Sequence, residues 1–333
     1  MTNNDTDKIE DAINSAPHLF HKFSFNGKPF LETKEAEERD LEIVKYLDRI
    51  SSNFRVIEDK KFTANKNVKS PLSDEQVGAI QNSLGSAVSI ITGGPGTGKT
   101  RIIEGLAQVL VKKYEKKIRI CAPTGRAAKR IAENPSLQTF KPSTIHMLIA
   151  TIESSAGISE IDALIVDESS MIDINLFKDL VKLVPDGAQL ILIGDVDQLP
   201  PVGPGQPFLD LIRSKKVMVS RLTQQFRQGS KSNISTVAKA VNRGEVIDYS
   251  SDLNSSDFIF IDVEKRDIVQ EITKALDKLS ENGKDRADLE RTQILSPMRR
   301  FPAGLTNLNA ILQEKYNPNS RKVFSKLENV LSY

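Results

Sequence analysis

Residues 93–100 have the composition and spacing of a phosphate-binding loop. They read Gly-Gly-Pro-Gly-Thr-Gly-Lys-Thr, fit the pattern G-x-x-x-x-G-K-[ST], and lie between an apolar run and a helix that we expect to begin near Lys99. The backbone N–H groups of such a loop and the N-terminus of the following helix attract phosphate. We therefore expect Lys99 to reach the terminal phosphates of a nucleoside triphosphate and Thr100 to bind Mg²⁺. A glycine-rich turn that binds no ligand is the weaker alternative.

Two acidic residues follow an apolar segment, as expected beside a phosphate site. Residues 163–166 read Ala-Leu-Ile-Val and lead into Asp167 and Glu168. We expect Asp167 to take part in the shell of the Mg²⁺ ion, and Glu168 to orient and deprotonate the attacking water. An acidic pair that ends a strand in solvent is the alternative.

Three further polar residues have the types needed around a nucleotide. Gln198 follows another apolar run, at the sheet edge where ligands of open α/β sheets bind, and could contact the γ-phosphate. Arg227 lies at the join between two expected units, where a guanidinium could bridge to developing phosphate charge; an ordinary surface arginine is the alternative. Gln76 has two equal interpretations, as the partner of Ser73 in a capping box or as an adenine contact.

The elements that must position these residues alternate in type along the chain. Apolar runs that are too short for helices lie at residues 87–92, 118–122, 163–166 and 190–193, separated by segments of helical length. This alternation predicts an α/β fold in which helices cover a parallel sheet. A capping-box pattern at residues 73–76 indicates where that unit begins.

We expect three regions along the chain. Residues 1–71 carry one helical pattern, at 41–50, and no chemistry that we can assign; residues 72–222 form the first α/β domain, with the nucleotide site; and residues 223–333 form a partial second one. In the last region we expect helices around 234–241, 268–279 and 305–312, and strands at 258–261 and 292–295.

Composition limits the class of protein. With 333 residues, of which 39% are hydrophobic, the chain can form a sizeable core, and 46 basic against 44 acidic residues leave a charge of only +2. Basic residues gather locally at 112–130, where either phosphate contacts or a solvated face would explain them. The single Cys121 and three histidines exclude a disulfide scaffold and a zinc site. A polar start and the lack of a long apolar run predict a cytoplasmic protein without a membrane partner.

Taken together, the motifs resemble those of superfamily 1 helicases, and their details resemble the RecD family, the alpha subunit of exodeoxyribonuclease V. The order of the motifs within residues 72–313 carries the resemblance: 93–100, 122–128 (Ala-Pro-Thr-Gly-Arg-Ala-Ala), 144–146 (Thr-Ile-His), 166–171 (Val-Asp-Glu-Ser-Ser-Met), 194–202 (Gly-Asp-Val-Asp-Gln-Leu-Pro-Pro-Val), 226–228 (Phe-Arg-Gln) and 294–300 (Ile-Leu-Ser-Pro-Met-Arg-Arg). The resemblance implies a RecA-like P-loop NTPase domain followed by an incomplete second RecA-like domain. It also implies an ATP-dependent helicase that moves 5′ to 3′ on single-stranded DNA. Such a motor works with RecB-like and RecC-like subunits in double-strand-break repair and recombination.

The resemblance also assigns roles to single residues. The implied nucleotide contacts are Gln76, Gly94, Pro95, Gly96, Thr97, Gly98, Lys99 and Thr100, with Thr100 and Asp167 on the metal. The implied catalytic set is Lys99, Asp167, Glu168, Gln198 and Arg227. The implied DNA contacts are Pro123, Thr124, Thr144 and His146. For His146, an ordinary packing role is an equal alternative.

The sequence departs from the family pattern toward its end. The family's later motifs, a His-Lys-x-Gln-Gly-Ser-like and a Thr-Arg-Ala-like segment, are absent, and Phe301 stands where the pattern has a glycine, a residue that indicates a special turn. We expect a truncated motor that alone binds ATP better than it hydrolyses it, because an arginine of the missing type contributes about 10³- to 10⁵-fold in related phosphoryl transfer. The alternatives are a non-motor fragment that binds nucleotide and partner subunits without unwinding, and a motor completed by a separately encoded half.

Overall fold

The protein is described by a computed structural model, which places residues 11, 13–25, 27–57, 72–154, 161–226, 232–247, 257–282 and 292–317. The chain forms two compact units, Met1–Ser235 and Thr236–Tyr333. Arg227 lies outside the described residues. Within the described ranges, no helix combines the length and apolar character that a membrane span requires.

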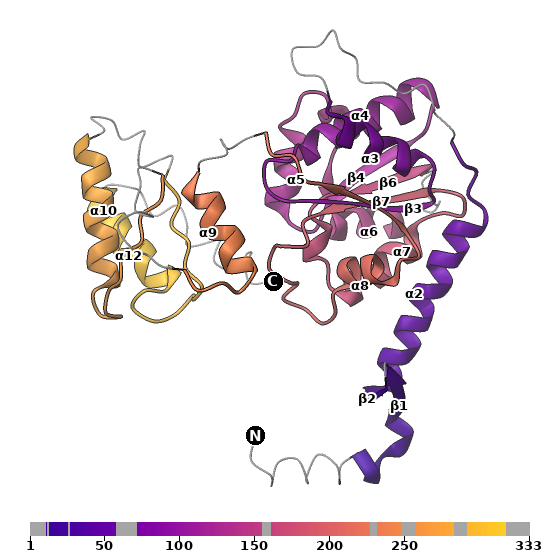
Figure 1. Cartoon of the computed structure of the whole chain (residues 1–333), viewed down its shortest axis with the longest axis horizontal. Coiled ribbons are helices and arrows are strands. Elements are labelled where there is room, and N and C mark those ends of the chain that lie inside the picture. The colour runs from indigo at the N-terminus through magenta and orange to yellow at the C-terminus, as the bar shows by residue number, and fades with distance from the viewer. Residues whose placement is uncertain are drawn as a thin grey trace. The chain divides into compact units, whose positions relative to one another are not determined.

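A six-stranded parallel sheet forms the centre of the first unit (Figure 1). Its strand order is β5-β4-β6-β7-β3-β8. The strands are β3 (Val88–Gly93), β4 (Ile118–Ala122), β5 (Ser143–Thr144), β6 (Ala163–Val166), β7 (Gln189–Gly194) and β8 (Met218–Leu222). The four predicted strands are thereby confirmed as β3, β4, β6 and β7. The two strands that the sequence did not predict, β5 and β8, are the edges of the sheet.

Helices cover both faces of this sheet, because its strands are apolar on both sides. Within β7, Leu190 and Leu192 belong to one buried cluster while Ile191 and Ile193 belong to the other, as the period of two in a strand requires. Figure 1 shows α3 and α4 on one side of the sheet and α6, α7 and α8 on the other. The helices are α3 (Asp74–Leu84), α4 (Lys99–Gln108), which continues in the π-helical turn η2 (Val109–Lys113), α5 (Gly125–Ala132), α6 (Ile145–Ser154), α7 (Ile174–Leu183) and α8 (Pro207–Ser214). Two short 3-10 turns, η3 (Gln138–Phe140) and η4 (Ser169–Met171), lie between them.

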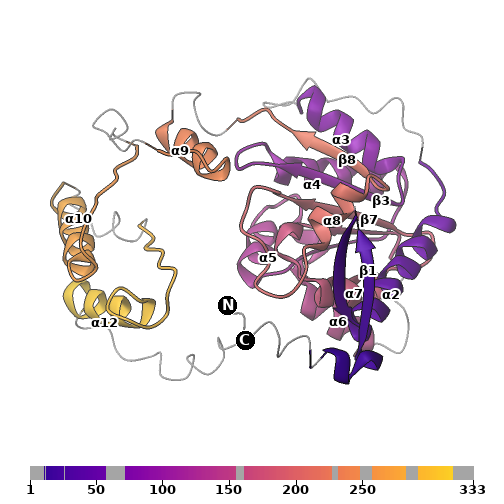
Figure 2. The same ribbon diagram turned by 60° about the horizontal axis from the view of Figure 1, so that its bottom comes forward.

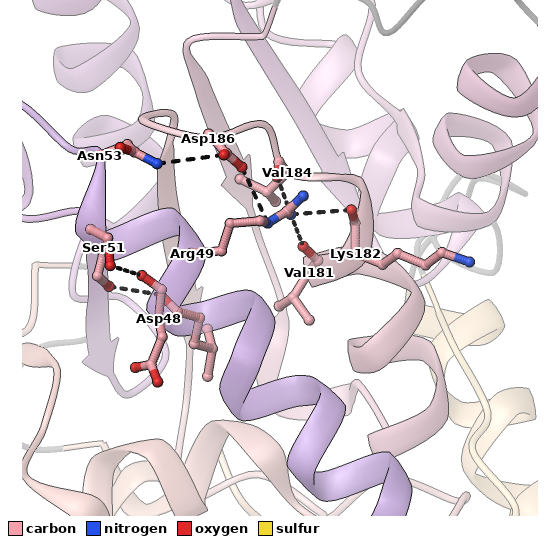
Figure 3. Close-up of polar contacts among 10 residues, drawn as sticks. Asp48, Arg49, Ser51, Asn53, Val181, Lys182, Val184 and Asp186 are labelled. Carbon is pink, nitrogen blue, oxygen red and sulfur yellow. Dashed lines mark hydrogen bonds and ion pairs between the residues drawn. The ribbon is translucent and has the colours of Figure 1, made fainter.

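The N-terminal segment is an antiparallel hairpin followed by a long helix that docks on the sheet unit. A 3-10 turn, η1 (Pro17–Leu19), leads into β1 (Phe20–Phe25) and β2 (Lys28–Thr33), and α2 (Lys34–Ser52) contains the helix predicted from the 41–50 pattern. Figure 2 shows α2 reaching from the hairpin to α7. The Arg49 side chain makes this junction: its Nη2 donates to the carbonyls of Val181, Lys182 and Val184 at 3.3, 3.2 and 2.6 Å, and its Nε lies 3.3 Å from Asp186 Oδ1 (Figure 3). One guanidinium therefore supplies additional donors to the carbonyls at and just after the C-terminal end of α7, where the helix itself offers few N–H partners.

The second unit consists of helices in the residues that are described. These are most of α9 (Asn233–Asn242), α10 (Ile268–Asn282) and α12 (Leu305–Tyr316), at the places that the sequence predicted. Asp277 of α10 accepts hydrogen bonds from Lys315 Nζ and Tyr316 Oη of α12, both at 2.7 Å, and the two helices lie side by side in Figure 2.

The two strands predicted in the second unit are wrong. Within the described residues, 258–261 contain only an isolated bridge at Phe258, and 292–295 are irregular. The side chains of Ile259 and Leu295 are 70% and 83% exposed. An apolar extended segment becomes a strand only when a neighbouring strand takes up its backbone hydrogen bonds along its length, and these two segments do not form such a ladder.

The special turn that a glycine at position 301 would indicate is retained although the residue is phenylalanine. Phe301 has φ +80°, a conformation that favours glycine, and a Cβ on Gly304 would collide with the Arg300 carbonyl. The phenylalanine therefore occupies a strained position in a turn that leads into α12.

Candidate nucleotide-binding site

The loop between β3 and α4 is folded into a phosphate cradle that only glycine can form at two points. Gly96 and Gly98 have φ of +79° and +83°. The Thr97 hydroxyl donates to the Gly94 carbonyl at 2.9 Å, which closes the loop. Lys99 Nζ donates back to the Gly93 and Gly94 carbonyls at 2.6 and 3.2 Å. The ammonium is therefore held at the mouth of the loop, where a phosphate would take over its hydrogen bonds.

The Gln76 side chain links α3 to this loop. Its Oε1 accepts from Ser73 N at 3.0 Å while Ser73 Oγ accepts from Gln76 N at 3.3 Å, so the predicted capping box is present. Its Nε2 donates to the Thr97 carbonyl at 3.0 Å, and the residue is only 1% exposed. Both ends of the amide are thus engaged, and an adenine contact by Gln76 would require at least one of these hydrogen bonds to open.

The acidic pair at the end of β6 lies opposite the loop. Asp167 Oδ1 accepts a hydrogen bond from Glu168 N at 2.9 Å, and Glu168 has the left-handed φ of +52°, which a non-glycine residue adopts only when its surroundings enforce it. Burial, and next the negative charge of Glu168, raise the pKa of Asp167 to about 6; the hydrogen bond from Glu168 N and the positive charges of Lys99 and Arg130 act in the opposite direction.

The carboxylate of Glu168 differs from that of Asp167 in its hydrogen bonding. Glu168 Oε2 is buried and has no hydrogen-bond partner among the described residues. A buried carboxylate oxygen without a partner is costly unless something else supplies a donor. A water molecule beside the terminal phosphate would supply one, which is the geometry expected of a residue that orients and deprotonates water.

One cavity of about 430 Å³ brings most of the predicted site together. The predicted residues that line it are Pro95, Gly96, Thr97, Gly98, Lys99, Thr100, Asp167, Glu168 and Gln198. Gly94 and Gln76 do not line the cavity, but each forms a hydrogen bond with Thr97 of the loop. The loop supplies phosphate-binding N–H groups and the opposite wall supplies carboxylates and an amide, so the cavity combines the parts needed for phosphoryl transfer.

Three residues of the cavity were not predicted: Arg101, Arg130 and Phe226. Phe226 is tied to the loop, because its N–H donates to the Gly96 carbonyl at 2.8 Å, and its side chain lies beside Gly98. Its position next to Arg227 in the sequence was the signal that could have drawn attention to it. Arg130 was counted only as a member of the basic run 112–130.

The residues present fit a Mg²⁺–nucleotide complex. No group of three or more His, Cys, Asp or Glu side chains in the described ranges could form a dedicated metal cage. Mg²⁺ does not need one, because it is usually held by one or two protein ligands, waters and phosphate oxygens. Thr100 and Asp167, both on the wall of the cavity, provide such a pair.

The four predicted DNA contacts lie at neighbouring strand ends of the same sheet edge. Pro123 and Thr124 follow β4, and Thr144 ends β5, with Ala122 and Thr144 directly paired. Thr124 Oγ1 accepts from Ala127 N and Thr144 Oγ1 from Met147 N, both at 3.2 Å, so both threonines also cap helices. His146 is exposed on the first turn of α6. A role for these residues in DNA binding stays a prediction.

Comparisons with known proteins identify a family and several similar proteins. A sequence profile of the AAA domain family matches residues 71–261. The chain is 32% identical over 259 residues to the ATP-dependent RecD2 DNA helicase of Deinococcus radiodurans, covering 76% of this chain and 34% of that protein. It is 31% identical over 199 residues to the RecBCD enzyme subunit RecD of Mycobacterium tuberculosis, covering 52% of this chain and 35% of that protein. The crystal structure of Pif1 helicase from Candida albicans aligns with 62% of this chain and 54% of that chain, at a TM-score of 0.41 and 23% identity.

The matches to the family profile and to the two RecD proteins agree with the resemblance of the motifs. The alignments span about a third of the length of the two curated relatives. The match to the AAA domain profile includes the β3–α4 loop and the acidic end of β6, since both lie within residues 71–261. The chain belongs to the AAA domain family, and its sequence is RecD-like.

Proposed function

We propose that this chain carries the ATP-hydrolysing site of a DNA helicase motor, with ATP and Mg²⁺ as its cofactors. One observation supports this more than any other. Residues 95–100 of the loop, the carboxylates of Asp167 and Glu168, and Gln198 line the same cavity. An isolated glycine-rich turn would have no reason to face a half-buried acidic pair.

The chemistry follows from the positions of these side chains. Lys99 exchanges its two loop carbonyls for phosphate oxygens, and Thr100 and Asp167 hold the metal. Bound Mg²⁺ neutralises charge on the terminal phosphates. Glu168 Oε2 accepts the proton of the attacking water, and Gln198 contacts the γ-phosphate. The Phe226 ring, beside Gly98, offers an apolar face to the base.

The energy of hydrolysis would be used on DNA. We assign the strand contacts to Pro123, Thr124, Thr144 and His146, which lie at the same edge of the sheet as the phosphate loop. Arg227 is assigned to the developing phosphate charge. From the RecBCD subunit among the relatives we further propose RecB-like and RecC-like partner subunits. From the resemblance of the motifs we propose 5′ to 3′ movement and a role in cytoplasmic double-strand-break repair and recombination.

The test combines ATP binding and ATP hydrolysis by the purified chain, with and without single-stranded DNA. Lys99→Ala should abolish binding, whereas Lys112→Ala, which removes an exposed lysine from the turn after α4, should leave it unchanged. DNA-stimulated turnover that requires Lys99 supports the motor. Binding that requires Lys99 without turnover retains the nucleotide site and rejects an autonomous motor. ATP binding that is indifferent to Lys99 would overturn the proposal.

A further inference from the structure

Arg130 belongs to the nucleotide cavity although it comes from a different part of the fold than the loop. It lies on α5, which follows β4, and β4 is the neighbour of β6 in the sheet. Side chains of a helix lean toward its N-terminus, and here the N-terminus lies at the ligand edge of the sheet. The Arg130 side chain accordingly lines the same cavity as Lys99, Asp167 and Glu168.

The guanidinium of Arg130 forms no hydrogen bond or ion pair within the described part of the chain. Among the residues that the structure describes, none forms a hydrogen bond or an ion pair with it, whereas Lys99 is bonded to two loop carbonyls. Arginine carries five N–H donors in a planar fork that matches the oxygens of a phosphate. A cation that lines a phosphate cavity without a protein partner is available to a ligand.

The acidic pair explains why a second cation is useful there. Asp167 and Glu168 face the position of the terminal phosphates, and two carboxylates close to a triphosphate repel it. The charge of Arg130 already acts on Asp167, since together with Lys99 it lowers the pKa that burial raises. The metal offsets part of the remaining repulsion, and a guanidinium on the same wall would offset more.

From this geometry we infer that Arg130 binds the γ-phosphate of ATP and gives the site its preference for ATP over ADP. The inference rests on the proposed function, because it names one more phosphate contact of the same site. The cation comes from the same unit as the phosphate loop. It is therefore present whatever Arg227 contributes.

The experiment measures the affinities of ATP and ADP with fluorescent analogues in the presence of Mg²⁺. Arg130→Ala removes the fork, Arg130→Lys keeps the charge without it, and Lys129→Ala removes the adjacent exposed cation of α5. We expect Arg130→Ala to reduce the ratio of ATP to ADP affinity by about tenfold or more, as for the loss of a hydrogen bond to a charged group. Arg130→Lys should recover part of the ratio, and Lys129→Ala should change it less than about twofold. Thermal unfolding of each variant shows whether the fold is retained.

The two proposals fail in different ways. If Lys99 is needed for ATP binding but Arg130→Ala leaves the ATP to ADP ratio unchanged, the inference is overturned and the proposed function stands. An equal loss of ATP and ADP affinity in a folded Arg130→Ala variant also overturns it, because the contact would then not be to the γ-phosphate. If the unsubstituted chain shows no Lys99-dependent ATP binding, both fall together.

Discussion

Replacing Asp167 with asparagine should make the protein more stable at neutral pH. The substitution keeps the shape of the side chain and the oxygen that accepts the hydrogen bond from Glu168 N. It removes the charge, which burial and the neighbouring Glu168 disfavour. The ionised carboxylate is therefore a cost that the nucleotide site imposes on the folded chain.

The magnitude follows from the pKa of Asp167. Its ordinary value of 3.8 is raised to about 6, and one pKa unit is worth about 1.36 kcal/mol, so ionisation in the folded state costs ~3 kcal/mol. The sign is fixed by proton binding: between these two values the folded state holds the proton more tightly than the unfolded state, so stability falls as pH rises. The benefit of Asp167→Asn should therefore be less than ~1 kcal/mol at pH 4 and reach ~3 kcal/mol above pH 7.

Urea unfolding followed by circular dichroism, at steps from pH 4 to pH 8, measures this difference. The second unit is common to both proteins and cancels when they are compared at each pH. Asp197→Asn is the matched control, because it removes an exposed carboxylate near the same cavity and should change the free energy of unfolding by less than ~0.5 kcal/mol. A stability difference for Asp167→Asn that does not change with pH, or that is largest at pH 4, would refute the electrostatic account of this site.

Three further outcomes are expected. Mg²⁺-dependent nucleotide binding should weaken as pH falls through about 6, because Asp167 must be ionised to hold the metal; a titration that is flat from pH 8 to 5 would contradict this. Gly98→Ala should lower the free energy of unfolding by ~2 kcal/mol, since φ is +83° and a Cβ at this position collides with the Gln76 side chain. Gly125→Ala, whose Cβ meets open space, should be neutral or stabilising. Arg49→Ala should cost ~1.5–3 kcal/mol in urea unfolding, because it removes the three hydrogen bonds that Arg49 donates to the carbonyls at the end of α7, whereas Arg39→Ala on the same helix should cost less than ~1 kcal/mol.

The core of the fold could be predicted because its signals are local. A strand buried on both faces is a short apolar run, and β3, β4, β6 and β7 have this pattern with few exposed positions. The edge strands β5 and β8 were not predicted, since β5 has only two residues and β8 is partly exposed. In the second unit, the apolar residues at 258–261 and 292–295 predict strands that do not form. Whether such segments pair depends on distant chain that a local pattern does not contain.

In the site, too, the residues of local sequence motifs could be predicted, whereas a residue brought in by the tertiary fold could not. The loop and the acidic pair are contiguous in sequence, so their motifs revealed them, and the ordering of strands brought them to one cavity. Arg130 lines that cavity because α5 follows β4, and β4 lies next to β6 in the sheet. The order of strands in the sheet cannot be read from the local spacing of residues. The structure also adds what sequence left open for Gln76: the capping box and the bond to the Thr97 carbonyl exist together.

The electrostatics of the cavity connect the stability prediction to the inference about Arg130. Asp167 is ionised at a cost, and Glu168 has a buried oxygen with no partner in the described residues, so the site stores unfavourable interactions. Mg²⁺, a water molecule and a triphosphate would each relieve one of these unfavourable interactions. The folded chain is therefore less stable without the nucleotide complex than it could be, and binding recovers that stability. The Arg130 guanidinium lines the same cavity and has no hydrogen-bond partner in the described residues. In our inference the γ-phosphate accepts its hydrogen bonds. If Asp167→Asn stabilises the empty protein while Arg130→Ala selectively weakens ATP binding, both effects have one cause: the cavity is built for charges that arrive with the nucleotide.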